Sequence, residues 1–161
     1  MRIYWINEFA KGNVGMMARP RGNDWLEDEI CKLKKLEVDT VVSLLEPNEI
    51  IELKLEKEKV ICKKWGLEFI NFPICDRAIP TDPNAFLKLI STIDTKLKDD
   101  KKIVVHCRMG IGRTSMVAAG LLIKNGAKLD IVFDLLSEKR TLNVPDTDQQ
   151  KQWVIGLKNL I

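Results

Sequence analysis

The chain has 161 residues, of which 45% are hydrophobic and 30% are charged. This composition excludes disordered and fibrous classes, and the length fits one ordinary domain, so we expect a single domain over residues 1–161. Lys and Arg exceed Asp and Glu by only 26 to 23, and no apolar run approaches the roughly 18 residues that span a bilayer. We therefore expect a cytoplasmic monomer with no nucleic-acid or membrane partner.

Four short apolar runs, rich in β-branched or aromatic residues, are typical of buried strands. They lie at residues 3–6, 41–45, 69–72 and 103–105. Longer helical patterns separate the later runs. This alternation predicts an α/β fold in which helices flank a central, mostly parallel twisted sheet of four to five strands.

Helical patterns fill the connections between these runs. The first covers residues 24–37, where Asp24 and Glu27 stand at capping-box spacing, and it is expected to link the first two strands. Residues 48–65 are interpreted as one or two charged helices that end at Gly66. Further helices are expected between Asp82 and Leu97, from beyond Cys107 to about Asn125, at about 129–139, and from Thr147 to the end.

The chain contains four cysteines and one histidine. The cysteines are Cys31, Cys62, Cys75 and Cys107. They form no C-x-x-C pair, so a structural zinc site is not expected. Three of them are most simply interpreted as small buried apolar residues. The fourth, Cys107, needs another explanation because of the residues around it.

Cys107 lies in the segment VVHCRMGIGRTS, residues 104–115, where a predicted strand ends and a helix begins. A helix N-terminus offers unpaired N–H groups and partial positive charge, and Gly110 and Gly112 let the backbone approach an anion closely. The same surroundings stabilise a thiolate, so we expect Cys107 to be ionised at neutral pH. The planar guanidinium of Arg113 can hold two phosphoryl oxygens. The segment therefore predicts a phosphate-binding loop that carries a nucleophile.

This H-C-x-x-G-x-G-R-T-S stretch resembles the signature loop of the protein-tyrosine phosphatase superfamily, in the compact, atypical dual-specificity form. The resemblance covers most of the chain from about Val41 onward. It implies hydrolysis of phosphate monoesters through a phosphocysteine on Cys107, with no metal or other cofactor. It also implies that the phosphate is bound by Arg108, Met109, Gly110, Ile111, Gly112 and Arg113.

The family needs an acid to protonate the leaving oxygen, and we predict Asp76 for this role. Asp76 follows the strand that precedes the signature strand, so both would emerge at the same edge of a parallel sheet, where ligands usually bind. Asp82 is the alternative, but it is better explained as a helix cap before Pro83.

Two neighbours of the nucleophile are given supporting roles. Thr114 can donate its hydroxyl to the leaving thiolate, although a hydroxyl in the first turn of a helix has a simpler structural explanation. His106 should point away from the pocket if Cys107 points toward it. The family uses this position to order the loop, so we expect His106 to support the loop and not to shuttle a proton.

The segment from Arg140 to Pro145, followed by Gln150, is similar to the closing segment of the family. A glutamine there can lie near the hydrolytic water. Thr147 and Gln150 also stand at capping-box spacing, which explains the glutamine equally well without catalysis. The family often has glycine where this chain has Thr141.

Several functional questions stay open at this point. Arg19 and Arg21, in the first long connection, either border the pocket or form a solvated basic loop. The substrate is expected to be a phosphorylated protein, carrying phosphotyrosine with or without phosphoserine and phosphothreonine. The alternatives are a non-catalytic module that binds phosphorylated ligands, and a phosphatase for phosphoinositides or RNA 5′-phosphates. Met109 and Ile111 stand where phosphoinositide enzymes of the family tend to carry lysines.

Overall fold

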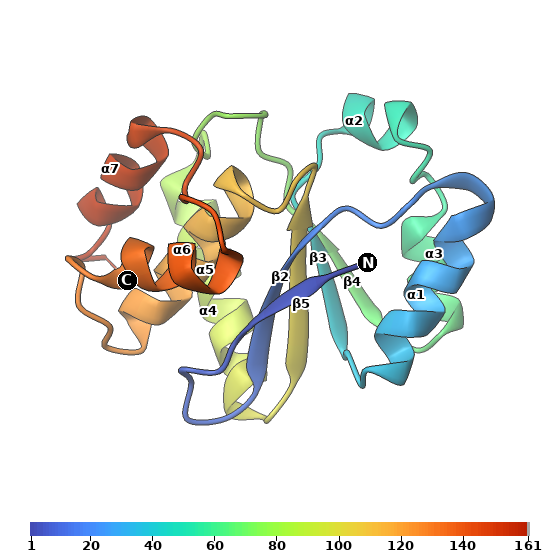
Figure 1. The fold of residues 1–161 in the computed structure, drawn as a ribbon, viewed down its shortest axis with the longest axis horizontal. Coiled ribbons are helices and arrows are strands. Elements are labelled where there is room, and N and C mark those ends of the chain that lie inside the picture. The colour runs from blue at the N-terminus through green and yellow to red at the C-terminus, as the bar shows by residue number, and fades with distance from the viewer. Residues whose placement is uncertain (161) are drawn as a thin grey trace.

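The computed structural model describes residues 1–160 and contains a five-stranded sheet of order β1-β2-β5-β3-β4 (Figure 1). The strands are β1 (Ile3–Ile6), β2 (Asn13–Ala18), β3 (Thr40–Ser43), β4 (Glu68–Asn71) and β5 (Lys102–Cys107). β1 runs antiparallel to β2, and the other three pairs are parallel. The prediction of a mostly parallel sheet of four to five strands is confirmed.

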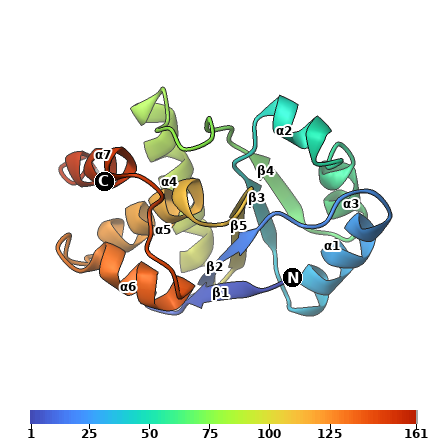
Figure 2. The same cartoon turned by 45° about the horizontal axis from the view of Figure 1, so that its top comes forward.

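The strand that the sequence analysis does not predict is β2. It forms a hairpin with β1 at one edge of the sheet, and β1 lies beside α6 (Val132–Arg140) (Figure 2). On its other side β2 pairs with β5. Because β2 intervenes, the first helix links the second strand to the third, and the expected link between the first two strands is wrong.

The helices occur where the sequence patterns predict them, with shifted ends. They are α1 (Leu26–Lys35), α2 (Pro47–Glu52), α3 (Glu58–Lys64), α4 (Pro83–Lys98), α5 (Gly112–Lys124), α6 and α7 (Asp148–Gly156), and a 3-10 turn (Asn23–Trp25) precedes α1. This turn makes Trp25 the N-cap of α1, which has no side-chain cap bond, so the expected capping box at Asp24 and Glu27 is wrong.

Helices cover both faces of the sheet (Figure 1). α1 and α3 lie on one side, and α4, α5 and α6 lie on the other, with α7 packed against α5. The two faces have separate cores because neighbouring residues of β5 point to opposite sides: Val104 packs with the α1 and α3 core, whereas Val105 and Cys107 pack with the α4 and α5 core. The same alternation decides which side chains at the end of β5 reach the site.

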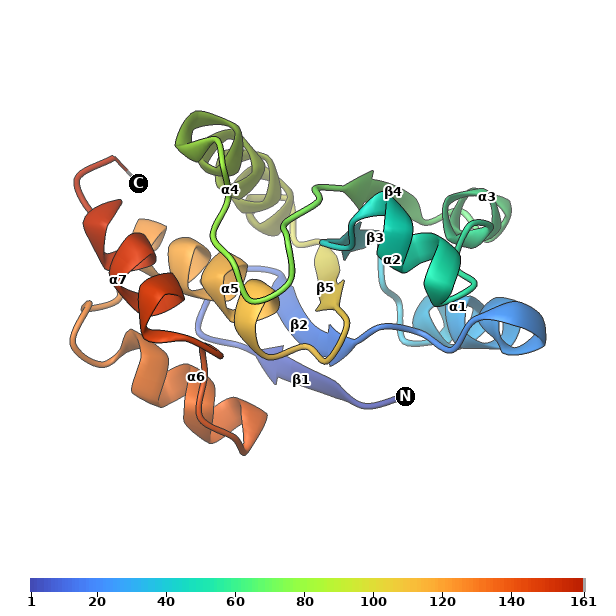
Figure 3. The same ribbon diagram turned by 90° about the horizontal axis from the view of Figure 1, so that it is seen from above.

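The parallel strands end together at one edge of the sheet. Ala18 of β2 is in register with Cys107 of β5, and Ser43 of β3 is in register with His106. Seen from above this edge, the segment between β4 and α4 passes over the start of α5 (Figure 3). Loops at the carboxyl ends of parallel strands commonly form binding sites.

The cysteines differ in exposure. Cys62 is buried, and burial together with the charge of Glu58 raises its pKa to about 12, so it behaves as an inert apolar side chain. Cys31 is half-buried, and Cys75 is exposed, so the expectation of a buried residue is wrong for Cys75. Within residues 1–160, no helix is long and apolar enough to cross a membrane.

Candidate active site

The segment between β5 and α5 forms a tight loop. Cys107 ends β5 and Gly112 begins α5, so the loop leads into the N-terminus of a 13-residue helix, whose dipole favours an anion. Gly110 has a φ of 66°, and a Cβ there would lie 2.3 Å from the carbonyl oxygen of Met17 on β2. The loop therefore requires glycine at position 110 to pass so close to β2.

The sulfur of Cys107 accepts two hydrogen bonds inside this loop. The residue is only 3% exposed. The N–H of Gly110 lies 3.3 Å from Sγ, and the hydroxyl of Thr114 lies 3.1 Å from it. Both donors are placed to stabilise negative charge on the sulfur. Thr114 is therefore where its predicted role requires it.

Arg113 is almost completely buried, with 1% of its surface exposed. Its two terminal nitrogens donate to both carboxylate oxygens of Glu49, at 2.6 and 2.9 Å. They also donate to the carbonyl oxygen of Ile74 at 3.0 Å and to Oδ1 of Asp76 at 2.8 Å. The guanidinium is thus fixed in one orientation at the site, as the predicted phosphate clamp requires.

Glu49, on α2, is a site residue that the sequence analysis misses. Besides the bonds from Arg113, the Glu49 carboxylate accepts hydrogen bonds from Nε of Arg108 at 3.3 Å and from the N–H of Glu46 at 3.0 Å. Burial alone would raise the pKa of Glu49, but the bonds from Arg113 and Glu46 and the arginine charges outweigh burial and lower it. A signal was present, because Glu49 follows the end of a strand that neighbours the signature strand.

We predict that Glu49→Gln lowers kcat/KM about tenfold, which corresponds to about 1.4 kcal/mol of lost transition-state stabilisation. The amide keeps the size of the side chain but removes the charge that orients Arg113. The unfolding free energy should fall by roughly 3 kcal/mol, because a buried guanidinium loses the buried one of its two carboxylate partners. Urea unfolding and steady-state kinetics measure both effects.

Glu52→Gln is the matched control. Glu52 is an exposed carboxylate on the same helix and contacts Arg108, not Arg113. If Glu52→Gln lowers kcat/KM as much as Glu49→Gln does, the effect comes from the overall charge of α2 and not from the orientation of Arg113.

Arg108, predicted to bind substrate, has its guanidinium turned toward α2. It donates to both carboxylate oxygens of Glu52, at 3.0 and 2.7 Å, in addition to the bond with Glu49. The side chain is therefore neutralised by the protein itself. Any part that Arg108 plays in phosphate binding is best assigned to its backbone N–H.

Asp76 lies in the segment between β4 and α4, and its side chain is 54% exposed. Its contact with Arg113 brings it to the site, as the common sheet edge predicts. Asp82 instead caps α4 by accepting from the N–H groups of Asn84 and Ala85 at 2.9 and 3.1 Å. The structure therefore gives the competing carboxylate a structural role.

A cavity of about 180 Å³ opens over the loop. Its lining includes Cys107, Arg113 and Asp76, together with Arg77 and Asp146 from the segments before α4 and α7. Of the other predicted loop residues, Arg108, Met109, Ile111 and Gly112 also line it. The cavity thus joins three segments that are far apart in the sequence.

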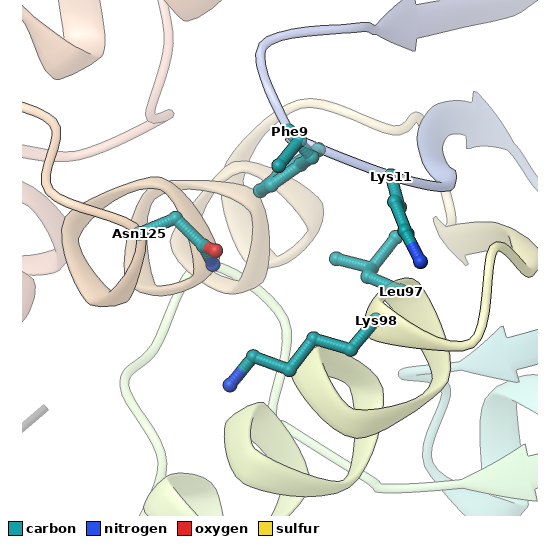
Figure 4. A pocket seen from close by; sticks show the side chains of 6 residues that line it. Phe9, Lys11, Leu97, Lys98 and Asn125 are labelled. Carbon is teal, nitrogen blue, oxygen red and sulfur yellow. The ribbon is translucent and has the colours of Figure 1, made fainter.

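A larger hollow, of about 340 Å³, lies at the opposite end of the sheet (Figure 4). It is formed by the β1–β2 turn and by the last residues of α4 and α5. Phe9, Leu97 and Asn125 line it together with Lys11 and Lys98. Its lining holds no cysteine, whereas Cys107 lines the smaller cavity, so we place the proposed active site there.

His106 points away from the cavity, as predicted. Its Nε2 lies 3.0 Å from Oε1 of Glu58 on α3, and both side chains are almost completely buried, at 0% and 2% exposed. α3 packs on the opposite face of the sheet from α5. The position of His106 under the loop agrees with a supporting role and not with a proton shuttle.

Gln150, in the first turn of α7, does not complete the capping box with Thr147 that its spacing suggests. Its N–H donates to the hydroxyl of Thr147, which caps the helix. Its side-chain amide instead donates to the carbonyl oxygen of Ala78 at 3.0 Å. A Cβ on Gly112 would lie 2.7 Å from Oε1 of Gln150. The side chain therefore lies between the acid-bearing segment and the start of α5.

Arg140 supports the signature loop, a contact that the sequence analysis does not predict. Its Nε and Nη2 donate to the carbonyl oxygens of Gly110 and Met109 at 2.9 and 3.0 Å. Its guanidinium lies over the ring of Tyr4, 4.2 Å from the centroid. The next residue, Thr141, has a φ of 60°, the left-handed conformation that favours glycine. A left-handed residue at this position agrees with the glycine that the family resemblance implies there.

The two arginines of the first long connection have different roles. Arg21 donates to the buried Glu29 at 2.9 Å and lies over the ring of Trp25, so it fastens the start of α1. Arg19 donates through its backbone N–H to the carbonyl oxygen of Arg108 at 3.4 Å. Of the two, only Arg19 contacts the signature loop, and it does so through its backbone.

Comparison with known proteins identifies relatives of this chain. Residues 14–127 match the family model Tc-R-P, described as "Polymorphic toxin system, DSP-PTPase phosphatase". The 197R protein of Invertebrate iridescent virus 6, whose name assigns it as a tyrosine phosphatase, is 30% identical over 145 residues, which cover 83% of this chain. Protein tyrosine phosphatase type IVA 3 of Bos taurus is 29% identical over 121 residues, which cover 73% of this chain.

The chain spans 49% of the length of the viral relative and 64% of the bovine one. Among solved structures, kinase associated phosphatase with serine in place of its catalytic cysteine superposes with a TM-score of 0.91. The two chains are 19% identical, and the match covers 99% of this chain and 95% of the other. This similarity establishes the fold.

Proposed function

The chain belongs to the DSP-PTPase family of phosphatases, and we propose that it hydrolyses phosphate monoesters through a phosphocysteine on Cys107. The proposal rests on the position of the Cys107 sulfur. Cys107 lines the cavity, and its sulfur accepts hydrogen bonds from the N–H of Gly110 and the hydroxyl of Thr114. A sulfur held by two donors at a helix N-terminus is suited to act as a nucleophile and then as a leaving group.

In the first step, Sγ of Cys107 attacks phosphorus and forms the S–P bond as the P–O bond to the leaving group breaks. Asp76, in its protonated form, gives its proton to the departing oxygen. Substrate phosphate takes the place of the Asp76 carboxylate beside Arg113, which frees that carboxyl to hold a proton. Arg113 and the loop amides stabilise the equatorial oxygens.

In the second step, water attacks the phosphocysteine, and the S–P bond breaks to release phosphate. Asp76 accepts the proton of the attacking water. The hydroxyl of Thr114 donates to the departing thiolate, and the side chain of Gln150 lies close enough to the loop to orient the water. Arg113 and the loop amides supply the positive charge for both steps, so we propose a reaction that needs no metal.

We propose a phosphorylated protein as the substrate, carrying phosphotyrosine with or without phosphoserine and phosphothreonine. The loop presents apolar side chains beside the phosphate site, because Met109 is 59% exposed and Ile111 also lines the cavity. Such a rim suits a peptide better than a highly phosphorylated lipid headgroup or an RNA end.

Hydrolysis of p-nitrophenyl phosphate in EDTA between pH 4 and pH 8 tests this function. We expect turnover with a bell-shaped dependence on pH, because the thiolate and the protonated acid are needed together. Phosphate or tungstate binding without turnover would instead identify the chain as a non-catalytic module that binds phosphorylated ligands.

Asp76→Asn should lower kcat for a phosphotyrosine peptide about 100-fold, because the amide cannot give a proton to the leaving oxygen. The loss should be smaller for p-nitrophenyl phosphate, whose leaving group departs as a stable anion. The decline of activity at high pH should also disappear. Asp82→Asn is the control, since asparagine still caps a helix. A larger loss in Asp82→Asn than in Asp76→Asn would assign the acid to Asp82.

A further inference from the structure

Three arginines line the Cys107 cavity, and the guanidinium groups of two of them are bound by acidic residues. Arg113 contacts Glu49 and Asp76 at 2.6 to 2.9 Å. Arg108 contacts Glu49 and Glu52 at 2.7 to 3.3 Å. Each guanidinium therefore has two carboxylate partners within the protein.

Arg77 is the third arginine, and it is held much more weakly. Within residues 1–160 its ionic partner is Asp146, whose Oδ2 lies 3.4 Å from Nε of Arg77. This distance exceeds the usual 2.7–3.2 Å of an N–H···O bond, and the two side chains are 67% and 38% exposed. Exposed pairs of this kind contribute little stability. The guanidinium can therefore exchange Asp146 for another carboxylate.

The backbone that carries Arg77 is fixed, although the side chain is not. Arg77 has a φ of 59° and lies in a turn that the N–H of Ala78 closes with the carbonyl oxygen of Cys75, at 3.0 Å. The side-chain amide of Gln150 donates a hydrogen bond to the carbonyl oxygen of Ala78. The guanidinium is thus tethered beside the cavity, next to Asp76, in a segment that does not need to refold to meet a substrate.

We infer that Arg77 is a specificity residue that binds an acidic side chain next to the phosphorylated residue of a peptide substrate. The inference rests on the proposed function. The phosphate itself already has Arg113 and the loop amides, so a cation at the edge of the cavity is available for a second anionic group. Asp146 pairs with Arg77 when no substrate is present, and a carboxylate of the bound substrate replaces Asp146 as its partner.

Two phosphotyrosine peptides test the inference, one with glutamate on both sides of the phosphotyrosine and one with glutamine at the same positions. The measured quantity is the ratio of their kcat/KM values, acidic over neutral. Because both peptides are assayed on one preparation, the ratio does not depend on the fraction of active protein. We expect the wild-type ratio to exceed one.

Arg77→Gln should lower this ratio about threefold to fivefold, in the upper part of the range of an exposed ion pair. Asp146→Asn should raise the ratio, because it removes the carboxylate that competes for Arg77. Lys59→Gln is the matched control: it also removes one positive charge, from an exposed residue of α3 that does not line the cavity. Its ratio should equal that of the wild type.

An unchanged ratio in Arg77→Gln would overturn the inference, and so would an equal decrease in Lys59→Gln, which would show an effect of overall charge. The proposed function is judged separately by turnover of the neutral peptide. A protein that hydrolyses the neutral peptide but shows no dependence on Arg77 keeps the proposed function and loses this inference.

Discussion

Cys107→Ser is expected to lower kcat for p-nitrophenyl phosphate by at least about 1,000-fold, because the variant lacks the nucleophile itself. The hydroxyl of serine is a much weaker nucleophile than a cysteine sulfur. The loop amides, the start of α5 and Arg113 all remain. Tungstate binding, measured by calorimetry, should therefore persist while turnover is lost.

Cys75→Ser is the matched control for this prediction. Cys75 is an exposed thiol one residue before Asp76, so the variant makes the same chemical change near the site without touching the proposed nucleophile. We expect it to keep wild-type turnover. Substantial activity in Cys107→Ser, or its loss in Cys75→Ser instead, would remove Cys107 from the mechanism.

Local chemistry explains why part of the site is predictable from the sequence. Cys107, Arg113 and Thr114 lie within eight consecutive residues, so their geometry follows from one strand, one turn and one helix. Asp76 is found by a further step, because parallel strands end at the same edge of a sheet. These assignments depend on chain order and on the glycine positions, both of which the sequence displays.

The partners that hold the site together are not predictable in this way. Glu49 is 64 residues from Arg113, and Arg140 is 30 residues from Gly110, whose carbonyl oxygen it binds. Which acidic residue of a charged helix turns inward depends on the packing of that helix. The pairing of Arg77 with Asp146 likewise depends on how two loops approach each other.

The missed strand β2 shows the same limit for the fold. Its sequence, NVGMMA, contains a glycine and two methionines and lacks the β-branched, alternating pattern of an ordinary strand. It forms because β1 and β5 lie on its two sides. A Cβ on Gly15 would lie 2.3 Å from Ile3 of β1, so the glycine that weakens the sequence signal is also what the packing requires.

Arg113→Lys is expected to lower kcat by about 100- to 1,000-fold, the usual effect of removing a donor that stabilises transition-state charge. An ammonium cannot hold two phosphoryl oxygens in the planar geometry of a guanidinium. The change should also lower the unfolding free energy by roughly 2 kcal/mol, because an ammonium keeps the charge but cannot replace both short bonds to the buried carboxylate of Glu49. Stopped assays and urea unfolding measure the two effects.

The double variant Glu49→Gln with Arg113→Met separates stability from catalysis, because it leaves neither charge of the buried pair behind. It should cost less stability than Glu49→Gln alone, which leaves a buried guanidinium without that carboxylate, but turnover should stay as low as in Arg113→Lys. Recovery of turnover together with stability would mean that Arg113 acts only by holding the fold. If stability recovers in the double variant while turnover stays low, the guanidinium acts on the transferring phosphoryl group.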